Sequence, residues 1–525
     1  MKSLPTFDSW HVLRDRRRHQ YWRAALVGLA AGALALLFQT ALEYAEAFRT
    51  NLLSYLHVES PIWGFLVLPI ITGLIGAFVG WMTSRFSPEA AGSGIPHVKG
   101  VLIHVNTMPW ARLLPVKFFG GLLSTGAGFS LGREGPTIQM GAAVGKLIAD
   151  VLKVPPKAAP RLMACGAGAG LSAAFHAPLA GFIFVIEELQ REFSALTYTM
   201  ALIAAVIAAI FTTTLHGTGN VFHASGFPAA SLYSLPVWLI VGIASGFLGA
   251  AFNKSLLAVQ RQTRERIKWP PWARAGIIGM IVGVVAWWLP EVCGGGHQIA
   301  EQILHGNFVA SSTLAFLVIL FIGKYFLTVL SYMAGVPGGV FAPMLVMGAS
   351  IGLITGITTS TLFPSIAPIP QAFAAMGMAA FFSAIVRAPL TGIVLVLEMT
   401  GDYHQLLPLL VASMVAYLIS ERLRVEPLYD ALLAYDLKRR QPDVPAHREP
   451  VLLEFVVQEG SQMEDKCIKD LPLPERCLLV TIARSGNDIL PSGDTRLQRG
   501  DHVTAVISGG ETTEAATRLL MLSKG

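Results

Sequence analysis

Three short glycine- and proline-rich motifs are the segments of this chain best suited to bind an ion. They read GSGIP at residues 92–96, GREGP at 132–136 and GGVFAP at 338–343. A helix that begins directly after such a turn presents unpaired N–H groups and a partial positive charge, and both attract anions. Neutral donors and helix dipoles bind an anion weakly enough to release it. The motifs therefore predict an anion site with Ser93 as its hydroxyl donor, although this serine also suits a plain helix cap.

Glu134, inside the second motif, adds a charge that changes with pH. An ionisable side chain within an apolar membrane segment is a functional candidate by default. A carboxylate beside an anion site competes with the anion for the same donors, and protonation removes that competition. Glu134 is therefore predicted to act as both a gate and a proton carrier, the alternative being a salt bridge to Arg133.

The composition places these motifs in a membrane protein. Of the 525 residues, 53% are hydrophobic and 14% are charged, whereas a soluble domain carries about 25% charged residues. The mean hydropathy is +0.56. Apolar runs near the length that spans a bilayer, roughly 20 residues, lie at about 24–48, 61–83, 113–130, 197–215, 235–259, 273–290, 313–333, 340–361 and 404–420.

The two halves of the membrane region resemble each other. Lys117 and Lys324 are each followed, at the same distance, by Met-Gly-Ala, and APLAG at 177–181 matches APLTG at 388–392. Short apolar segments lie at corresponding places in the two halves, which is typical of broken helices around a binding site. The sequence thus predicts an internal duplication, and an odd number of spans in each half would make the repeats inverted. We place the repeats at about 24–218 and 235–436.

This duplication separates two neighbouring glutamates. Glu187 has a counterpart in Glu398, whereas Glu188 aligns with Met399. A position shared by both repeats favours a structural role, and an unshared one favours a function special to the first half. Glu188 is therefore a candidate site residue.

The matched lysines, Lys117 and Lys324, lie within apolar runs. A buried lysine is costly unless it is paired or lies in a polar cavity. Either the two lysines add positive potential to the anion path, or they pair with carboxylates.

Other function classes find little support. The basic residues of segment 1–23, which directly precede the first apolar run, favour a cytoplasmic N-terminus by the positive-inside rule over nucleic-acid binding. The four cysteines form no CxxC pair, and the histidines form no HExxH cluster, so neither a metal nor a cofactor is expected. GAGAG at 166–170 lacks the flanking elements of a dinucleotide site, and no nucleophile–base pair points to an enzyme.

The chain changes character near residue 437. Residues 437–450 are charged and contain proline, as in a linker, and 451–525 predict a small cytosolic α+β domain. Alternating apolar residues favour strands at 453–457, 478–483 and 502–507, with a final helix at 511–522.

The three motifs, in this order and with this internal repeat, resemble the signature of the CLC family of chloride channels and chloride–proton antiporters over residues 24–436. The resemblance implies an all-α polytopic membrane protein of two inverted helical repeats with broken helices. It also implies a homodimer with one anion pathway in each subunit, multi-pass in the bacterial inner membrane with both termini in the cytoplasm.

The resemblance also assigns a central anion site. Ser93 is similar to its hydroxyl donor, and Tyr429, in EPLYDALL, is similar to the tyrosine that completes it. The backbone amides of Val340 and Phe341 are expected to face the same anion. From the sequence alone, Tyr429 also suits an interfacial aromatic anchor.

Two glutamates carry the expected coupling. Glu134 resembles the external gating glutamate, with the amides from Arg133 to Gly135 serving an outer site, and Glu188 resembles the internal proton-transfer glutamate. Having both implies chloride–proton antiport, the alternative being a passive chloride channel. A serine in the first motif resembles the chloride-preferring members, which favours chloride over nitrate or fluoride.

Two features remain outside this picture. His97 and Lys99 stand where bacterial relatives often have acidic residues, which alters the field around Glu188 if this segment lies near the inner proton path. The tail at 451–525 resembles a TrkA-C (RCK-C) domain, and such domains commonly bind a small ligand or dimerise.

Overall fold

The computed structural model describes residues 7–156, 158–190, 195–217, 222, 232–266, 269–306, 313–364, 369–440, 451–474, 477–484, 487–507, 518–519 and 521–523. It divides the chain into two compact units, Met1–Leu433 and Ala434–Gly525, and each is described by itself. Most of the expected linker, 441–450, lies outside the described residues.

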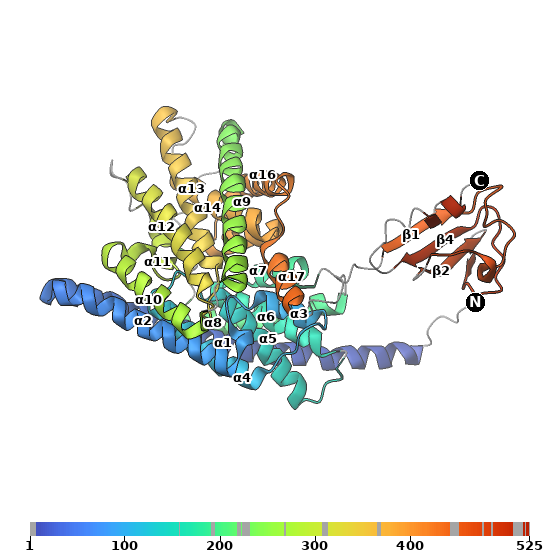
Figure 1. Ribbon diagram of the computed structural model, residues 1–525, viewed down its shortest axis with the longest axis horizontal. Coiled ribbons are helices and arrows are strands. Elements are labelled where there is room, and N and C mark those ends of the chain that lie inside the picture. The colour runs from blue at the N-terminus through green and yellow to red at the C-terminus, as the bar shows by residue number, and fades with distance from the viewer. Residues whose placement is uncertain are drawn as a thin grey trace. The chain divides into compact units, whose positions relative to one another are not determined.

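The first unit is helical, and its elements follow one another in two similar series (Figure 1). The first series is α1 (Phe7–Glu59), α2 (Pro61–Phe86), α3 (Ile95–Leu102), α4 (Trp110–Gly126), α5 (Glu134–Val151), α6 (Ala159–Phe175), α7 (Pro178–Phe184) and α8 (Ala195–His216). The second is α9 (Leu235–Glu265), α10 (Pro271–Trp288), α11 (His297–His305), α12 (Thr313–Met333), α13 (Phe341–Leu362), α14 (Gln371–Val386), α15 (Pro389–Thr400) and α16 (Leu406–Arg422). The last helix, α17, covers Leu428–Arg440.

Helix lengths separate membrane-crossing segments from interrupted ones. Within the described residues, eight helices are long and apolar enough to cross a membrane. The run expected at 113–130 is not among them, because α4 has only 17 residues. Helices α3, α7 and α11 have only 8, 7 and 9 residues, too few to cross a membrane. The first residues of α3, Ile95 and Pro96, are buried. Such ends can present backbone groups to an ion.

Small residues let matched helix pairs pack closely in both repeats. A Cβ atom added to Gly141 of α5 would lie 2.1 Å from the Gly166 carbonyl oxygen of α6. The second repeat shows the same contact between α13 and α14, where a Cβ at Gly348 would lie 2.4 Å from the Gly377 carbonyl oxygen. Helices α2 and α10, which lie side by side (Figure 1), also meet through glycines. Close backbone approach of this kind is how helices pack within a bilayer.

The second unit contains an antiparallel sheet of four strands in the order β1-β4-β2-β3. The strands are β1 (Val451–Val456), β2 (Cys477–Arg484), β3 (Asn487–Ile489) and β4 (His502–Ile507). Three of them coincide with the predicted strands to within two residues. β3 was not predicted, because its three residues follow a turn too closely to show any alternation. The helix expected at 511–522 lies largely outside the described residues.

Candidate anion and proton site

The three glycine-rich motifs meet at one place. The Gly92 amide donates to the Val336 carbonyl (3.2 Å), and the Gly338 amide donates to the Gly92 carbonyl (3.0 Å). Gly132 and Gly339 exchange a pair of hydrogen bonds of 2.6 and 2.8 Å. These backbone bonds tie the loops that precede α3, α5 and α13 to one another. The N-terminal ends of three helices from both repeats are therefore held together.

Gly135 shows how tightly these helix ends pack. A Cβ atom at this position would lie 2.6 Å from the Ser93 carbonyl oxygen and 3.0 Å from the Gly339 Cα atom. Only a glycine fits at the centre of the three loops. The unpaired N–H groups of the first helical turns are thus concentrated where an anion would gain most from them.

Ser93 lies in the first of these loops and Tyr429 in the first turn of α17, and both side chains are fully buried. The Ile95 amide donates to the Ser93 hydroxyl oxygen at 3.4 Å, and because the oxygen is the acceptor, the hydroxyl proton can still be donated elsewhere. Among the described residues, the Tyr429 hydroxyl has no hydrogen-bond partner. A buried hydroxyl without a partner is costly. Its environment therefore suits a bound anion that accepts its proton.

The surroundings of Tyr429 include one residue that the sequence did not reveal. Its side chain lies close enough to Tyr332, Glu188 and Glu134 to interact electrostatically with all three. The Tyr332 hydroxyl, from α12, lies against Gly92. No motif marks Tyr332, and only the contact between the two repeats brings it to the site.

Val340 and Phe341 lie at the start of α13 and are fully buried. The Phe341 ring packs on Phe382 (ring centroids 4.4 Å apart) and on Phe175 (5.4 Å). This aromatic layer excludes water from the helix end. Excluding water strengthens any interaction between the helix end and an anion.

Glu134 is the first residue of α5, and its side chain is fully buried. One carboxylate oxygen, Oε1, lies 3.0 Å from Nε2 of His297. The other, Oε2, has no partner among the described residues and lies over Gly132, where a Cβ atom would come within 2.2 Å of it. Arg133 does not neutralise this carboxylate, because its guanidinium contacts Glu43 at 3.6 Å and the Ala174 carbonyl at 3.2 Å. The salt-bridge alternative for Glu134 is therefore not what the structure shows.

Glu188 lies in a π-helical turn, η2 (Val185–Gln190), and is buried. The Lys99 ammonium donates to its carboxylate at 2.7 Å and also pairs with Asp430, the neighbour of Tyr429. The Asp430 side chain is 31% exposed. A chain of charged groups thus runs from a buried carboxylate to solvent. His97, by contrast, contacts the Thr107 carbonyl and the Gln139 side chain.

Glu187 and Glu398 have matching roles in the two repeats. The Glu187 carboxylate accepts hydrogen bonds from the backbone amides of Leu390 and Thr391, at the start of α15. The Glu398 carboxylate accepts from Leu179 and Ala180, at the start of α7. The glutamate of each repeat therefore caps the start of a helix in the other repeat. This is a structural role for the position that the two repeats share.

Lys117 and Lys324 also have matching roles. The Lys117 ammonium donates to the carbonyls of Ala90 (2.9 Å) and Gly92 (2.7 Å). The Lys324 ammonium donates to those of Val292 (3.0 Å) and Gly294 (2.8 Å). Each lysine fixes the loop that leads into a short helix, α3 or α11. Within the described part of the chain, both ammonium groups donate to backbone oxygens rather than to carboxylates.

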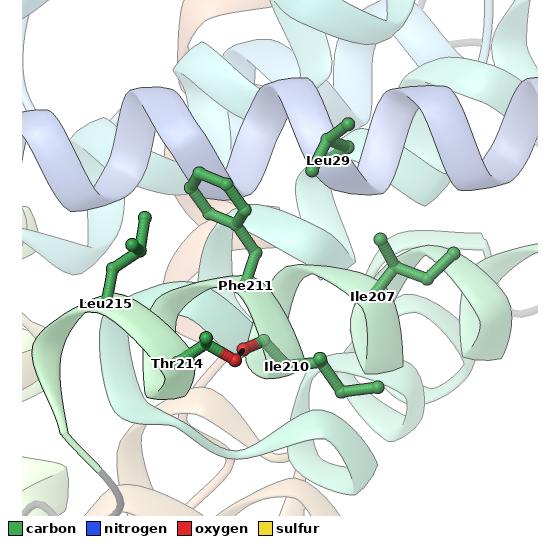
Figure 2. A pocket seen from close by; sticks show the side chains of 6 residues that line it. All are labelled: Leu29, Ile207, Ile210, Phe211, Thr214 and Leu215. Carbon is green, nitrogen blue, oxygen red and sulfur yellow. Dashed lines mark hydrogen bonds between the residues drawn. The ribbon is translucent and has the colours of Figure 1, made fainter.

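An apolar hollow elsewhere has a different character. Figure 2 shows it between α1 and α8, lined by Leu29, Ile207, Ile210, Phe211, Thr214 and Leu215. Its one hydroxyl, on Thr214, donates to the Ile210 carbonyl at 2.7 Å. With an apolar lining and its one hydroxyl already donating, the hollow has no donor for an anion. Within the described part of the chain, no group of three or more His, Cys, Asp or Glu side chains is placed to hold a metal ion.

The fold defines a polytopic membrane protein in which three helix ends meet, with buried hydroxyls and two buried carboxylates in the same unit. Residues 75–421 match the family described as voltage gated chloride channel, and residues 452–520 match the TrkA-C domain. The chain belongs to this chloride channel family, the CLC family.

Similar proteins agree with this assignment. The chain is 38% identical over 440 residues to the H(+)/Cl(-) exchange transporter ClcA of Vibrio campbellii, covering 81% of this chain and 92% of that protein. The ClcA of Cronobacter sakazakii is 37% identical over 438 residues, with coverage of 81% and 91%. The structure of a slow cyanobacterial Cl-/H+ antiporter superposes with a TM-score of 0.76 at 34% identity, covering 80% of this chain and 99% of that one. The predicted fold is confirmed.

Proposed function

We propose that this protein is a secondary active transporter that exchanges chloride for protons, and not an enzyme. The observation that carries the proposal is the pair of buried carboxylates, Glu134 and Glu188, both within electrostatic range of the unpartnered Tyr429 hydroxyl. An anion held near Tyr429 and a proton held on either glutamate influence each other directly. The relatives named as H(+)/Cl(-) exchange transporters support chloride as the anion.

Chloride occupies a central site formed by Ser93, Tyr429 and the backbone amides of Val340 and Phe341. These donors carry no full charge, so the ion is bound but can leave. The amides from Arg133 to Gly135 supply an outer site. Lys117 supports the geometry by fixing the loop that holds Ser93.

Glu134 alternates between two states. As a carboxylate it competes with chloride for the outer amides and closes the pathway. Once protonated it loses that competition and gives up its place to the anion. Glu188 relays protons to the inner solution, and the Lys99–Asp430 pair connects it to the protein surface.

The assembly and location follow from the same proposal. The transporter is a homodimer in the bacterial inner membrane, with both termini in the cytoplasm and one anion pathway in each subunit. The TrkA-C domain binds a small ligand or another copy of itself. Neither a metal nor a cofactor takes part in transport.

Replacing Glu134 tests the proposal. In proteoliposomes, Glu134→Ala is expected to keep chloride flux, because the competing carboxylate is gone, and to lose proton movement, because no group remains to carry the proton. A chloride electrode and an internal pH dye record both fluxes from one sample. Proton movement that persists at the wild-type ratio in Glu134→Ala would remove Glu134 from the mechanism.

A further inference from the structure

His297 makes the one hydrogen bond that the Glu134 carboxylate has among the described residues. Its Nε2 atom lies 3.0 Å from Glu134 Oε1, while Oε2 has no partner there. Neither sequence motif nor repeat matching singled out this histidine. It is nevertheless placed against the group that is proposed to take up and release protons.

The histidine also connects a buried group to solvent. The Glu134 side chain is 0% exposed, whereas that of His297 is 20% exposed. Within the described residues, the second ring nitrogen, Nδ1, has no protein partner and is not among the buried polar atoms. One nitrogen therefore faces the carboxylate and the other is open to water. An imidazole can accept a proton at one nitrogen and donate from the other near neutral pH.

The position of the ring is fixed by the loop before it. Gly294 and Gly296 adopt positive φ angles of 65° and 83°, nearly the values of Gly92 and Gly94 (64° and 84°) around Ser93. The Lys324 ammonium donates to the Gly294 carbonyl, as Lys117 does to that of Gly92. The loop that delivers His297 is therefore the second-repeat counterpart of the loop that delivers Ser93.

Aromatic rings hold the imidazole from the sides. Phe175 meets it edge-on at a centroid distance of 6.0 Å, and Phe222 lies 6.5 Å away. These contacts restrict the orientation of the imidazole ring. Proton transfer requires the donor to lie within hydrogen-bond reach of the acceptor, and the His297 ring lies within that reach of Glu134.

Few other charges face this ring. On its own helix, Glu301 lies one turn further on, near His305. Helices α13 and α14, against which α11 packs, contain no ionisable residue. Lys324 of α12 approaches Gly296, and Arg49 and Glu46 of α1 approach Gly294. Glu134 is therefore the charged group in direct contact with His297.

We propose that His297 is a proton relay between Glu134 and the outer solution, an inference that rests on the proposed exchange function. A proton from water binds Nδ1, the Nε2–H bond breaks, and that proton bonds to Glu134 Oε1. The ring is left neutral with its proton on Nδ1. When the protonated Glu134 side chain has moved away, Nε2 takes up a proton from water that enters its place and Nδ1 releases its proton to the outer solution, which restores the starting tautomer. The transfer runs in reverse when Glu134 is deprotonated toward the outside. No oxidant, reductant or other reactant is needed.

Two substitutions separate a relay from a mere hydrogen-bond partner. The amide of His297→Gln can still donate to Glu134 but cannot pass a proton on. His297→Ala leaves a space that free imidazole can enter. His305→Gln, at the other end of α11, is the matched control. Exchange is measured in proteoliposomes as a function of external pH, with and without imidazole added outside.

We expect His297→Gln to keep the chloride-to-proton ratio and to lower the exchange rate by about tenfold or more, in line with the usual contribution of a positioned proton donor. External imidazole should restore the rate of His297→Ala, and His305→Gln should behave as the wild type. In the Glu134→Ala background, where no proton is transferred, His297→Gln should leave chloride flux unchanged.

Three results would overturn the relay. They are a wild-type rate and pH profile in His297→Gln, no restoration of His297→Ala by imidazole, and an equal loss of chloride flux when His297→Gln is added to Glu134→Ala. Failure of the proposed exchange function is recognised separately, because then the wild-type protein itself would move chloride without protons.

Discussion

Glu187 and Glu188 are neighbours in the chain but have opposite surroundings. Glu187 accepts hydrogen bonds from two backbone amides and the Thr391 hydroxyl at the start of α15. Glu188 is buried against Lys99. The first arrangement stabilises a helix, and the second holds a charge that can change. Of these two adjacent residues, Glu187 thus has a structural role, and Glu188 is the one proposed to carry protons.

This difference gives a prediction with a built-in control. Glu188→Gln should uncouple chloride flux from proton movement, because the amide cannot carry a proton. Glu187→Gln should keep the chloride-to-proton ratio and lose about 1 kcal/mol of stability, since an amide has one acceptor oxygen for the same donors. Flux assays and thermal unfolding in detergent measure the two effects. Normal coupling in Glu188→Gln would require another inner proton path.

At the residue scale, the sequence predicts the candidate site residues better than the residues that contact them. Ser93, Glu134 and Glu188 stand out through residue type, motif and repeat mismatch. His297 and Tyr332 do not, because each reaches the site through contacts with a distant segment of the other repeat. Lys99 was noted as a departure, but its double contact with Glu188 and Asp430 depends on three separate helical elements.

At the element scale, the tail sheet depends on an ion pair at the start of β4. The Arg484 guanidinium binds both carboxylate oxygens of Asp501, at 2.7 and 2.8 Å, and the Gln498 amide donates to one of them at 2.8 Å. Burial alone would raise the pKa of Asp501, but these hydrogen bonds outweigh it and hold the pKa below its usual value. The bond ties the end of β2 to the turn before β4.

A lowered carboxyl pKa predicts how the tail responds to acid. The stabilisation is fully present above the unfolded pKa, about 3.9, and is lost as the pH falls through the lower folded pKa. Asp501→Asn should therefore unfold more easily than the wild type at pH 7, by about 1–3 kcal/mol, and the difference should shrink below about pH 4. Chemical unfolding of residues 451–525 at several pH values measures it, and a difference that does not change with pH would contradict this role for the pair.

Helices and strands were predicted best where a single sequence pattern, either a long apolar run or strict alternation, covers the whole element. Long apolar runs and alternating strands correspond closely to the helices and strands observed. The sequence missed β3, which is short, and overestimated the run at 113–130, because the helix there, α4, ends at Gly126. The basic segment 1–23 was expected as a separate region, yet α1 begins at Phe7 and continues through it into the first span. Helix propensity does not stop where hydrophobicity does.

At the scale of the whole molecule, the two units have separate hydrophobic cores. The membrane unit contains one large cluster and a smaller one where α9, α14 and α16 meet, and the tail has its own cluster around Phe455, Ile482 and Val503. No residue proposed to bind chloride or protons lies in the tail. Removing residues 441–525 should therefore leave the chloride-to-proton ratio unchanged in proteoliposomes. A folded but inactive truncated protein would show that the tail is required for transport.

The central claim is that chloride and proton movements are coupled in this protein. The most direct test uses the purified wild-type chain in proteoliposomes, with a chloride gradient, the membrane voltage clamped by potassium and valinomycin, and internal pH recorded. We expect chloride flow to drive protons uphill in the opposite direction. Chloride flux with no proton movement would contradict it and would make the protein a passive chloride channel.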